Sequence, residues 1–424
     1  MKNKLSAFAC AILAVLMLFS CGEDDVYYSA NDTAVTKAPE SEKAAPELPE
    51  VNEDLSFADN LMKMTAADGN RMISPYSAKM CLALLANGAD GETKQQILDA
   101  IGISDIDAYN TEVKKLLERY ETYAGVMSLE TANSLWLNQS VFGGDGAFLK
   151  DYRDAMQNFY SAEVREVTSA NSIEEVNAWV NEKTKEKIPT ILTEDHRNFA
   201  TALVNAVYFK AAWENEFSKH LTEEKDFNNI DGTKSKLDFM HNTDYYEYYE
   251  AEGVKAVKLD YGRYGENEND YVNDRNYNFS MYIMLGDDIN VDKFLSNAEF
   301  ENCRVALSIP KFELEYSFGL NEILMALGMI DAYDGNKADF SKMIDLSTLN
   351  DNLVVSDVLQ KTYIGIDEVG TEAAAVTAII MVECAAVIDT AEPIEFTADK
   401  PFFFAIRDNT SGELLFVGRY EQAH

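Results

Sequence analysis

The sequence predicts an α+β fold in a single large domain, and three observations lead to this prediction. The chain has 424 residues, of which 47% are hydrophobic and 11% aromatic, so one large core can be filled. Helical patterns dominate the first half and strand patterns the second, without the alternation of a doubly wound sheet. The strand segments are almost continuously apolar, which indicates sheets whose faces are covered by helices.

Capping residues predict where the helices begin. Ser74 is a suitable N-cap and Pro75 suits the first helical position, and apolar residues then recur at helical spacing. A second helix is expected over residues 93–101. Ser172-Ile-Glu-Glu has the form of a capping box, so we expect an amphipathic helix to start there and to end at Pro189.

Apolar runs rich in β-branched and aromatic residues predict the strands. They cover residues 131–138, 201–213, 254–261, 277–285, 304–316 and 355–367. Three further buried strands are expected to begin at Ile394, Phe402 and Leu414, and Asn409-Thr-Ser-Gly separates the last two.

Composition and motifs exclude several classes of function. The 73 acidic and 36 basic residues give a net charge of -37, which repels phosphates, so we expect no nucleic-acid partner. No catalytic fingerprint, phosphate-binding loop or metal-binding spacing occurs, and the four histidines lie far apart. We therefore expect a protein that is not an enzyme and that binds no cofactor and no metal.

The cysteines predict no disulfide framework. Of the five, Cys10 lies in a leader segment and Cys21 in a lipidation motif, which leaves Cys81, Cys303 and Cys384. An odd number with no two-residue spacing favours free thiols over bridges or a metal site. Cys81 and Cys303 are expected to be inert core thiols, so stability must come from the core.

The amino-terminal segment has the features of an export signal. A basic start and an apolar core predict a signal peptide over residues 1–20. Leu18-Phe-Ser-Cys21 resembles the lipobox of bacterial lipoproteins, which implies that Cys21 carries lipid; a plain secretory signal or a single membrane helix is the alternative. Residues 21–52 are polar and predict a disordered tether. We expect the chain to be lipid-anchored at the bacterial outer membrane or cell surface, with no other membrane contact.

Residues 367–378 have the pattern of a strand that is held out of a sheet. Small and β-compatible side chains could enter between two existing strands, and Gly370 with the alanines leaves the backbone easy to move. In strand geometry Thr371 and the alternate residues after it share one uncharged face. We expect this segment to insert with that face toward the core.

Five further motifs stand in the order in which the serpin family has them, and the chain resembles the serpins over residues 53–424. The motifs are Asn70-Arg-Met-Ile-Ser-Pro-Tyr-Ser, Ala86-Asn-Gly-Ala-Asp-Gly-Glu-Thr, Leu203-Val-Asn-Ala-Val-Tyr-Phe-Lys-Ala-Ala-Trp, Ile309-Pro-Lys-Phe-Glu-Leu and Asp399-Lys-Pro-Phe-Phe-Phe. The resemblance implies large mixed and antiparallel β-sheets, about nine helices and an exposed reactive-centre loop at about residues 368–393.

The resemblance also implies a function. It is that of an irreversible suicide-substrate inhibitor, which traps a serine or cysteine endopeptidase as an acyl-enzyme when the loop inserts into the large sheet. The implied hinge residues are Glu368, Gly370, Thr371, Glu372, Ala373, Ala374 and Ala375. The implied sheet-opening residues are Ser74, Ser77, Asn205, Trp213 and Gln360, the last at a position where many serpins carry histidine. The alternatives are a non-inhibitory serpin-fold binding module cleaved as an ordinary substrate, and a hydrolase with an unrecognised site.

The bait bond is predicted from two landmarks that give different answers. Counting forward from the hinge places the cut between Cys384 and Ala385, whereas counting back from the next strand places it near Val387. The residues around the bond are small and apolar apart from Glu383, and residues 362–399 contain no lysine or arginine. We therefore expect an elastase-like serine protease, or a papain-like cysteine protease, as the partner of a monomeric inhibitor.

Overall fold

The computed structural model describes residues 49–65, 69–123, 127–142, 146–262, 279–348, 352–371 and 392–423, all within one compact unit. The predicted signal peptide, Cys21 and most of the predicted tether lie outside the described residues. The same holds for Glu372, Ala373, Ala374, Ala375, Cys384, Ala385 and Val387.

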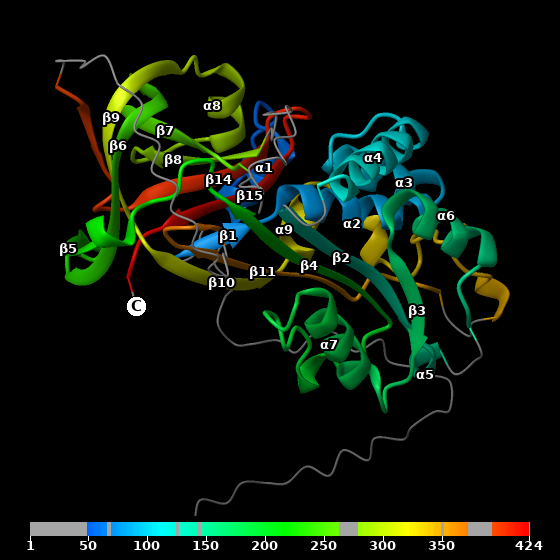
Figure 1. Cartoon of the computed structure of the whole chain (residues 1–424). Helices are drawn as coiled ribbons and strands as arrows, with labels where there is room; N and C mark the ends of the chain where they lie inside the picture. Colours follow the sequence, from blue (N-terminus) through cyan, green and yellow to red (C-terminus); the bar gives the residue numbers. More distant parts are fainter. Residues whose placement is uncertain are drawn as a thin grey trace, which may run out of the picture. The chain divides into compact units, whose positions relative to one another are not determined.

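The described residues form nine α-helices, which confirms the expected number (Figure 1). They are α1 (Phe57–Met64), α2 (Pro75–Gly88), α3 (Gly91–Ala100), α4 (Ile106–Glu121), α5 (Gln139–Phe142), α6 (Lys150–Tyr160), α7 (Ser172–Lys183), α8 (Val291–Asn297) and α9 (Asn321–Ala326).

The predicted cap of α2 is confirmed and that of α7 is wrong. Ser74 is the N-cap of α2 and Pro75 its first residue. In α7 the N-cap is Asn171, and Ser172 is already helical. The hydroxyl of Ser172 donates to the carbonyl of Arg197 at 3.1 Å, so it ties the helix to a loop instead of closing a capping box.

The end of α7 also differs from the prediction. The helix ends at Lys183, six residues before Pro189. Lys185 and Glu186 adopt positive φ angles of 53° and 66°, a conformation in which a right-handed helix cannot continue. Two left-handed residues therefore end this helix, and the proline lies in the loop beyond it.

One sheet of the described residues has six strands in the order β10-β11-β12-β4-β2-β3. The strands are β10 (Phe312–Gly319), β11 (Asp357–Ile366), β12 (Gly370–Thr371), β4 (Thr201–Ala212), β2 (Met127–Asn138) and β3 (Glu163–Val167). Strands β11 and β4 pair in parallel, whereas β10 and β2 run antiparallel to β11 and β4 respectively. Two parallel strands thus lie side by side in the middle of this sheet.

The other sheet has nine strands in the order β1-β15-β14-β8-β7-β6-β9-β13, with β5 paired to β6. The strands are β1 (Arg71–Ile73), β5 (Glu223–Asn228), β6 (Lys234–Ala251), β7 (Val254–Asp260), β8 (Phe279–Leu285), β9 (Glu301–Pro310), β13 (Ile394–Thr397), β14 (Phe402–Asp408) and β15 (Leu414–Tyr420).

The single strand predicted over residues 304–316 is wrong, because the structure divides it between the two sheets. Strand β9 ends at Pro310, which has no N–H to continue a ladder, and β10 begins at Phe312. The N–H of the intervening Lys311 donates to the carbonyl of Asp238. The chain therefore changes sheet at this residue.

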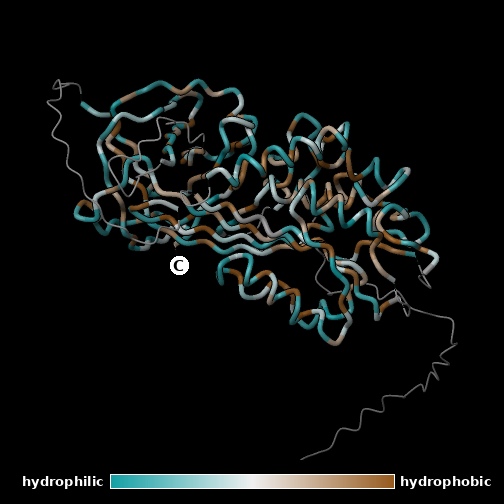
Figure 2. The backbone as a smooth tube through the Cα atoms, turned by 45° about the vertical axis from the view of Figure 1, so that its right-hand side comes forward, coloured by the Kyte–Doolittle hydropathy of each residue, from teal (hydrophilic) through white to brown (hydrophobic). Residues whose placement is uncertain are grey.

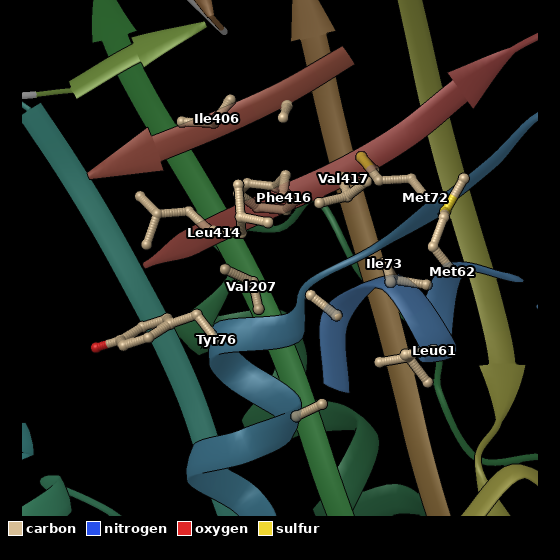
Figure 3. Packing of buried hydrophobic residues seen from close by; sticks show 14 of the residues in the cluster. Leu61, Met62, Met72, Ile73, Tyr76, Val207, Ile406, Leu414, Phe416 and Val417 are labelled. Atoms are coloured by element: carbon tan, nitrogen blue, oxygen red, sulfur yellow. The ribbon is translucent and has the colours of Figure 1, made fainter. Parts of the chain in front are cut away.

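The main core lies where the start of α2 meets strands of both sheets (Figure 3). Leu61 from α1, Ile73 from β1, Val207 from β4 and Phe416 from β15 are all buried there. Helix α2 contacts β4 and β2 from this side. The six-stranded sheet is thus supported by a helix on its inner face, which lies between it and the rest of the core.

Helix α7 belongs to a second, smaller core (Figures 1 and 2). Val176 and Trp179 of α7 pack on Trp136 of β2 and on Ala202 and Val204 of β4. The two tryptophan rings meet edge to face, with centroids 5.9 Å apart. Helices thus cover both faces of the six-stranded sheet, as its apolar strands predicted.

Candidate functional site at the seam between β4 and β11

The seam is the line along which β4 and β11 lie side by side. The two strands pair directly along one part of it and are separated by β12 at its end. The two strands pair in parallel up to Tyr363 of β11. Beyond that point β12 lies between them, with Thr371 opposite Ile366 of β11 and Gly370 opposite Ala212 of β4. Strand β12 is antiparallel to both neighbours. Gly370 and Thr371 of the predicted inserting segment therefore already lie in the sheet.

Gly370 is required by a close approach of two backbones. A Cβ atom at this position would lie 2.1 Å from the carbonyl oxygen of Ala211 and 2.7 Å from the Cα of Ala212. The N–H of Gly370 donates to the side chain of Asp367 at 3.1 Å, which closes the turn before β12. The backbone can therefore enter the seam here only because no side chain is present.

Thr371 is fully buried, as predicted for the inward face. Its hydroxyl forms a hydrogen bond of 2.6 Å with the hydroxyl of Tyr261. The Tyr261 ring stacks on Trp213 with centroids 4.7 Å apart and an interplanar angle of 13°. Burial raises the pKa of Tyr261 well above its ordinary value, so this phenol is neutral.

Trp213 holds the turn that leads into β12. Its indole N–H donates to the carbonyl of Asp367 at 2.9 Å, and its backbone N–H donates to the carbonyl of Val369 at 2.9 Å. The prediction that Trp213 lies where the inserting strand enters is consistent with this position. Both bonds fix residues of the turn immediately before β12.

Glu368 is anchored by charge in the same turn. Its carboxylate lies 3.1 Å from the ammonium of Lys311 and accepts a hydrogen bond of 2.8 Å from Thr222. Burial alone would raise the pKa of Glu368, but hydrogen bonds from its own backbone, Thr222 and Lys311 outweigh this and lower it. The hinge thus starts from an ionised, tethered carboxylate.

Gln360 bridges the closed part of the seam. Its amide oxygen accepts from the N–H of Ser74 at 2.8 Å, and its amide nitrogen donates to the carbonyl of Ser74 at 3.0 Å and to the side chain of Asn205 at 2.8 Å. Gln360 belongs to β11, Asn205 to β4 and Ser74 to the cap of α2. One side chain therefore ties both strands to the helix below them.

Asn205 continues this network toward β2. Its amide donates to the carbonyl of Ser77 at 2.8 Å, to the hydroxyl of Ser77, and to the side chain of Asn133 at 2.6 Å. All three residues are buried. The structure thus brings together four of the five predicted sheet-opening residues, Ser74, Ser77, Asn205 and Gln360, while Trp213 lies at the hinge.

A comparison with protein families matches residues 52–423 to the family Serpin (serine protease inhibitor). The chain belongs to the serpin family. Serpin B6 of Macaca fascicularis is 33% identical over 399 residues, which cover 86% of this chain and 97% of that relative. Among solved structures, the thermophilic serpin tengpin in its native state aligns with a TM-score of 0.74 and 28% identity, covering 89% of this chain and 96% of that chain.

The native stressed conformation of Arabidopsis AtSerpin1 is also similar to this serpin, with a TM-score of 0.70 and 27% identity over 86% of this chain and 95% of that chain. Members of this family are in general protease inhibitors and not catalytic enzymes. The serpin fold predicted from the motifs is therefore confirmed, together with its large sheets.

Four contributors to the site were missed in the sequence. Asn133 stands among apolar residues of a predicted strand, and a buried polar residue there is a signal that could have been followed. Lys311 lies within a quoted family motif, but nothing in the sequence pairs it with the hinge. Thr222 and Tyr261 gave no signal, because their partners are more than 100 residues away in the chain.

The remaining predictions concern metal ligands, membrane spans and cysteines in the described part of this serpin. No cluster of three potential metal ligands occurs among the described residues, and no helix described is long and apolar enough to cross a membrane. Cys81 is buried, and burial raises its pKa to about 12, which confirms an inert core thiol. Cys303, near the start of β9, is half-buried and packs against the main core, so its prediction as a core thiol is confirmed in part.

Proposed function

We propose that this serpin is an irreversible suicide-substrate inhibitor of a serine or cysteine endopeptidase. The observation that carries the proposal is β12. It lies antiparallel between two strands that are otherwise parallel to each other, and Thr371 within it is fully buried. An inserted strand that continued along this seam would be antiparallel to both neighbours, and antiparallel pairing is the more stable arrangement per residue.

The chemistry of trapping belongs to the protease. Its nucleophile attacks the carbonyl carbon of the bait residue, the peptide bond breaks, and the new amino terminus leaves with a proton. The bait residue then remains bound to the enzyme as an ester or thioester. Insertion of the freed strand into the seam carries this acyl-enzyme away before water can hydrolyse it, so the inhibitor and the protease stay covalently joined.

The connection between the two sheets fits this mechanism. Thr371 ends β12 in the six-stranded sheet, and Ile394 begins β13 in the nine-stranded sheet. The 22 residues between them join two separate sheets, so cutting this segment frees β12 to extend without moving β13. Similarity to the native stressed conformation of AtSerpin1 supports the same proposal.

For the target we propose an elastase-like serine protease, with a papain-like cysteine protease as the second class. The proposed bait bond joins Cys384 and Ala385, with Val387 as the alternative position, and its neighbours are small and apolar apart from Glu383. Mass spectrometry of the fragment released by each protease would identify the bond. Efficient trapping of a trypsin-like protease, with a released fragment that shows cleavage after lysine or arginine, would contradict this choice of target class.

The test of inhibition is the formation of a covalent complex. Mixing the serpin with active protease should give a band on a denaturing gel at the summed mass, and protease activity should fall in proportion. The same protease with its nucleophile replaced by alanine should give no such band. Clean cleavage with full residual activity would instead identify a non-inhibitory serpin that is cut as a substrate.

For the location we propose a bacterial lipoprotein anchored through Cys21 after removal of residues 1–20. The basic start, the apolar core and the Leu18-Phe-Ser-Cys21 motif support this proposal. Expression with a clickable fatty acid should label the wild-type protein and leave Cys21→Ser unlabelled. Label on Cys21→Ser, or none on the wild type, would contradict anchoring at this residue.

A further inference from the structure

We propose that the Tyr261 hydroxyl is a positioning group for loop insertion, because its hydrogen bond holds Thr371, the last residue of β12, in the seam before any protease binds. The inference rests on the proposed inhibitory function and assigns to Tyr261 a role that its place at the end of a strand did not suggest. The relevant atoms are the two hydroxyl oxygens, 2.6 Å apart.

Tyr261 is held in place independently of the loop. It follows β7, and its N–H donates to the carbonyl of Phe279 at 3.0 Å. It forms a bridge with Trp213 through the backbone and stacks on the same residue through its ring. The ring of Phe209 packs edge-on against it, with centroids 5.1 Å apart. The phenol therefore presents its hydroxyl at a fixed point of the seam.

The buried Tyr261 hydroxyl needs a hydrogen-bond partner, and this favours the state in which Thr371 lies in the seam. The Tyr261 hydroxyl is buried, and Thr371 is the partner found for it among the described residues. If Thr371 left the seam, this hydroxyl would become an unpaired polar group unless water replaced the threonine, and such a group is costly to bury. The neutral state of the phenol, caused by burial, lets it act as donor or acceptor toward the threonine.

The contact selects for a hydroxyl at position 371. Serine can make the same hydrogen bond as threonine, whereas valine has the same shape as threonine but leaves the Tyr261 hydroxyl unpaired. Apart from this contact, Thr371 is held by backbone pairing with Ile366 and Ala211, which does not depend on its side chain. The hydrogen bond to Tyr261 thus restricts the side chain at position 371 by its hydroxyl group in addition to its size.

The consequence for inhibition is kinetic. Insertion must finish before the acyl-enzyme is hydrolysed, and the first residue to enter a closed seam has no inserted neighbour to support it. Here Thr371 is already paired with Ile366 on one side and Ala211 on the other, and Tyr261 keeps it there. After cleavage the following residues can then extend an existing strand, so fewer acyl-enzymes escape by hydrolysis.

The experiment is a double-mutant cycle with Tyr261→Phe and Thr371→Val. Each variant keeps its packing and loses one hydroxyl. One hydrogen bond of this kind corresponds to about a two- to tenfold change in an equilibrium or partition ratio. We expect each single variant to raise the stoichiometry of inhibition by about this factor, and the double variant to raise it no further. Thr371→Ser should behave like the wild type.

A second readout reports on the intact protein without a protease. Hydrogen–deuterium exchange of a peptide covering residues 364–371 should be faster in Tyr261→Phe and in Thr371→Val than in the wild type. Tyr152→Phe is the matched control, because the Tyr152 hydroxyl is buried and donates to the carbonyl of Leu84 at 2.7 Å, away from the seam. It should lower thermal stability and leave exchange of residues 364–371 unchanged.

Two results would overturn the proposal. Additive effects of the two substitutions on stoichiometry would mean that the hydroxyls act separately, and unchanged exchange of residues 364–371 would mean that the bond does not hold Thr371. Failure of the inhibitory function gives a different pattern: no covalent complex with the wild type. In that case the exchange measurement still decides whether Tyr261 seats the hinge.

Discussion

Replacing Gly370 by alanine tests most directly whether entry of the loop into the seam determines inhibition. The added methyl group would lie 2.1 Å from the carbonyl oxygen of Ala211, where ordinary contacts are 3.4 Å or longer. The obstructing atoms belong to the backbone of β4, which is a central strand paired on both sides. The clash therefore cannot be relieved by a change of side-chain rotamer.

The size of the expected effect of Gly370→Ala on inhibition follows from the free-energy cost of overpacking. Forcing one extra carbon into a close-packed region costs about 1–3 kcal/mol. Moving β12 out by the missing distance of about 1 Å would disturb its pairing with β4, which depends on a spacing of about 4.8 Å between strands. If the intact protein avoids the clash by releasing β12 from the seam, the cost falls on the inserted state alone, and the partition between trapping and hydrolysis shifts by about 5- to 150-fold.

The assay is a titration of a fixed amount of protease with increasing inhibitor, followed by a denaturing gel. Wild-type protein should leave mainly covalent complex, whereas Gly370→Ala should leave mainly cleaved inhibitor and require several-fold more inhibitor per protease. Gly319→Ala is the matched control: it lies in the same sheet, in β10, and its Cβ would meet nothing within 4 Å. This variant should inhibit like the wild type.

An unchanged stoichiometry for Gly370→Ala would refute the reasoning. It would mean that β12 need not occupy its position between β4 and β11 for trapping to succeed. A loss of inhibition in both glycine variants would contradict it as well, since the effect would then come from general destabilisation. Thermal melting of the intact variants separates these outcomes. A clash confined to the hinge should lower the melting temperature far less than a disturbance of the core.

Three further substitutions have defined outcomes. Thr371→Arg would place an uncompensated charge in a fully buried position at a cost of several kcal/mol, so the titration should show cleavage without trapping. Glu368→Gln removes the charge that pairs with Lys311 and should lower the stability of the intact protein by about 1 kcal/mol at neutral pH. Because the folded pKa of Glu368 is lowered below its ordinary 4.5, this difference in melting temperature should shrink as the pH falls below that value; a difference independent of pH would contradict the ion pair. Gln360→His should make sheet opening pH-dependent, since an imidazolium cannot accept from the N–H of Ser74. Position 360 is fully buried, so the closed seam should weaken at a pH below about 6.5, whereas glutamine does not ionise; equal changes in the melting temperatures of variant and wild type with pH would contradict this.

The elements of this serpin that could be predicted are those with a strong local signal. Ser74 and Pro75 specify the start of α2 by capping, and the apolar run of β4 predicts a strand covered on both faces, as found. The polar strands β5 and β6 were not predicted, because half of their residues face solvent and the apolar period is weak. Their positions are set by pairing with β9 and with each other.

The candidate site was predictable only where a family motif or the alternation of a strand supplied it. Position 371 was expected to face inward from this alternation, and its burial is consistent with that prediction. Tyr261, Lys311 and Thr222 meet the hinge only because the two sheets lie against each other there, so no local pattern contains the pairing. The bait bond and the rest of the hinge lie outside the described residues and stay predictions.

The described contacts explain how one seam can be stable in the intact protein and still open. Polar groups hold it at two levels: Gln360 links both strands to α2, and Tyr261 holds Thr371 at the entrance. A hydrogen bond contributes about 1 kcal/mol net and can be exchanged for another within the same geometry, whereas opening an apolar seam would expose surface at each step. An advancing strand offers new backbone donors and acceptors to β4 and β11 as it parts them. Under the proposed inhibitory mechanism, the seam opens by exchange of partners, and the residues that close it before cleavage are those that release it afterwards.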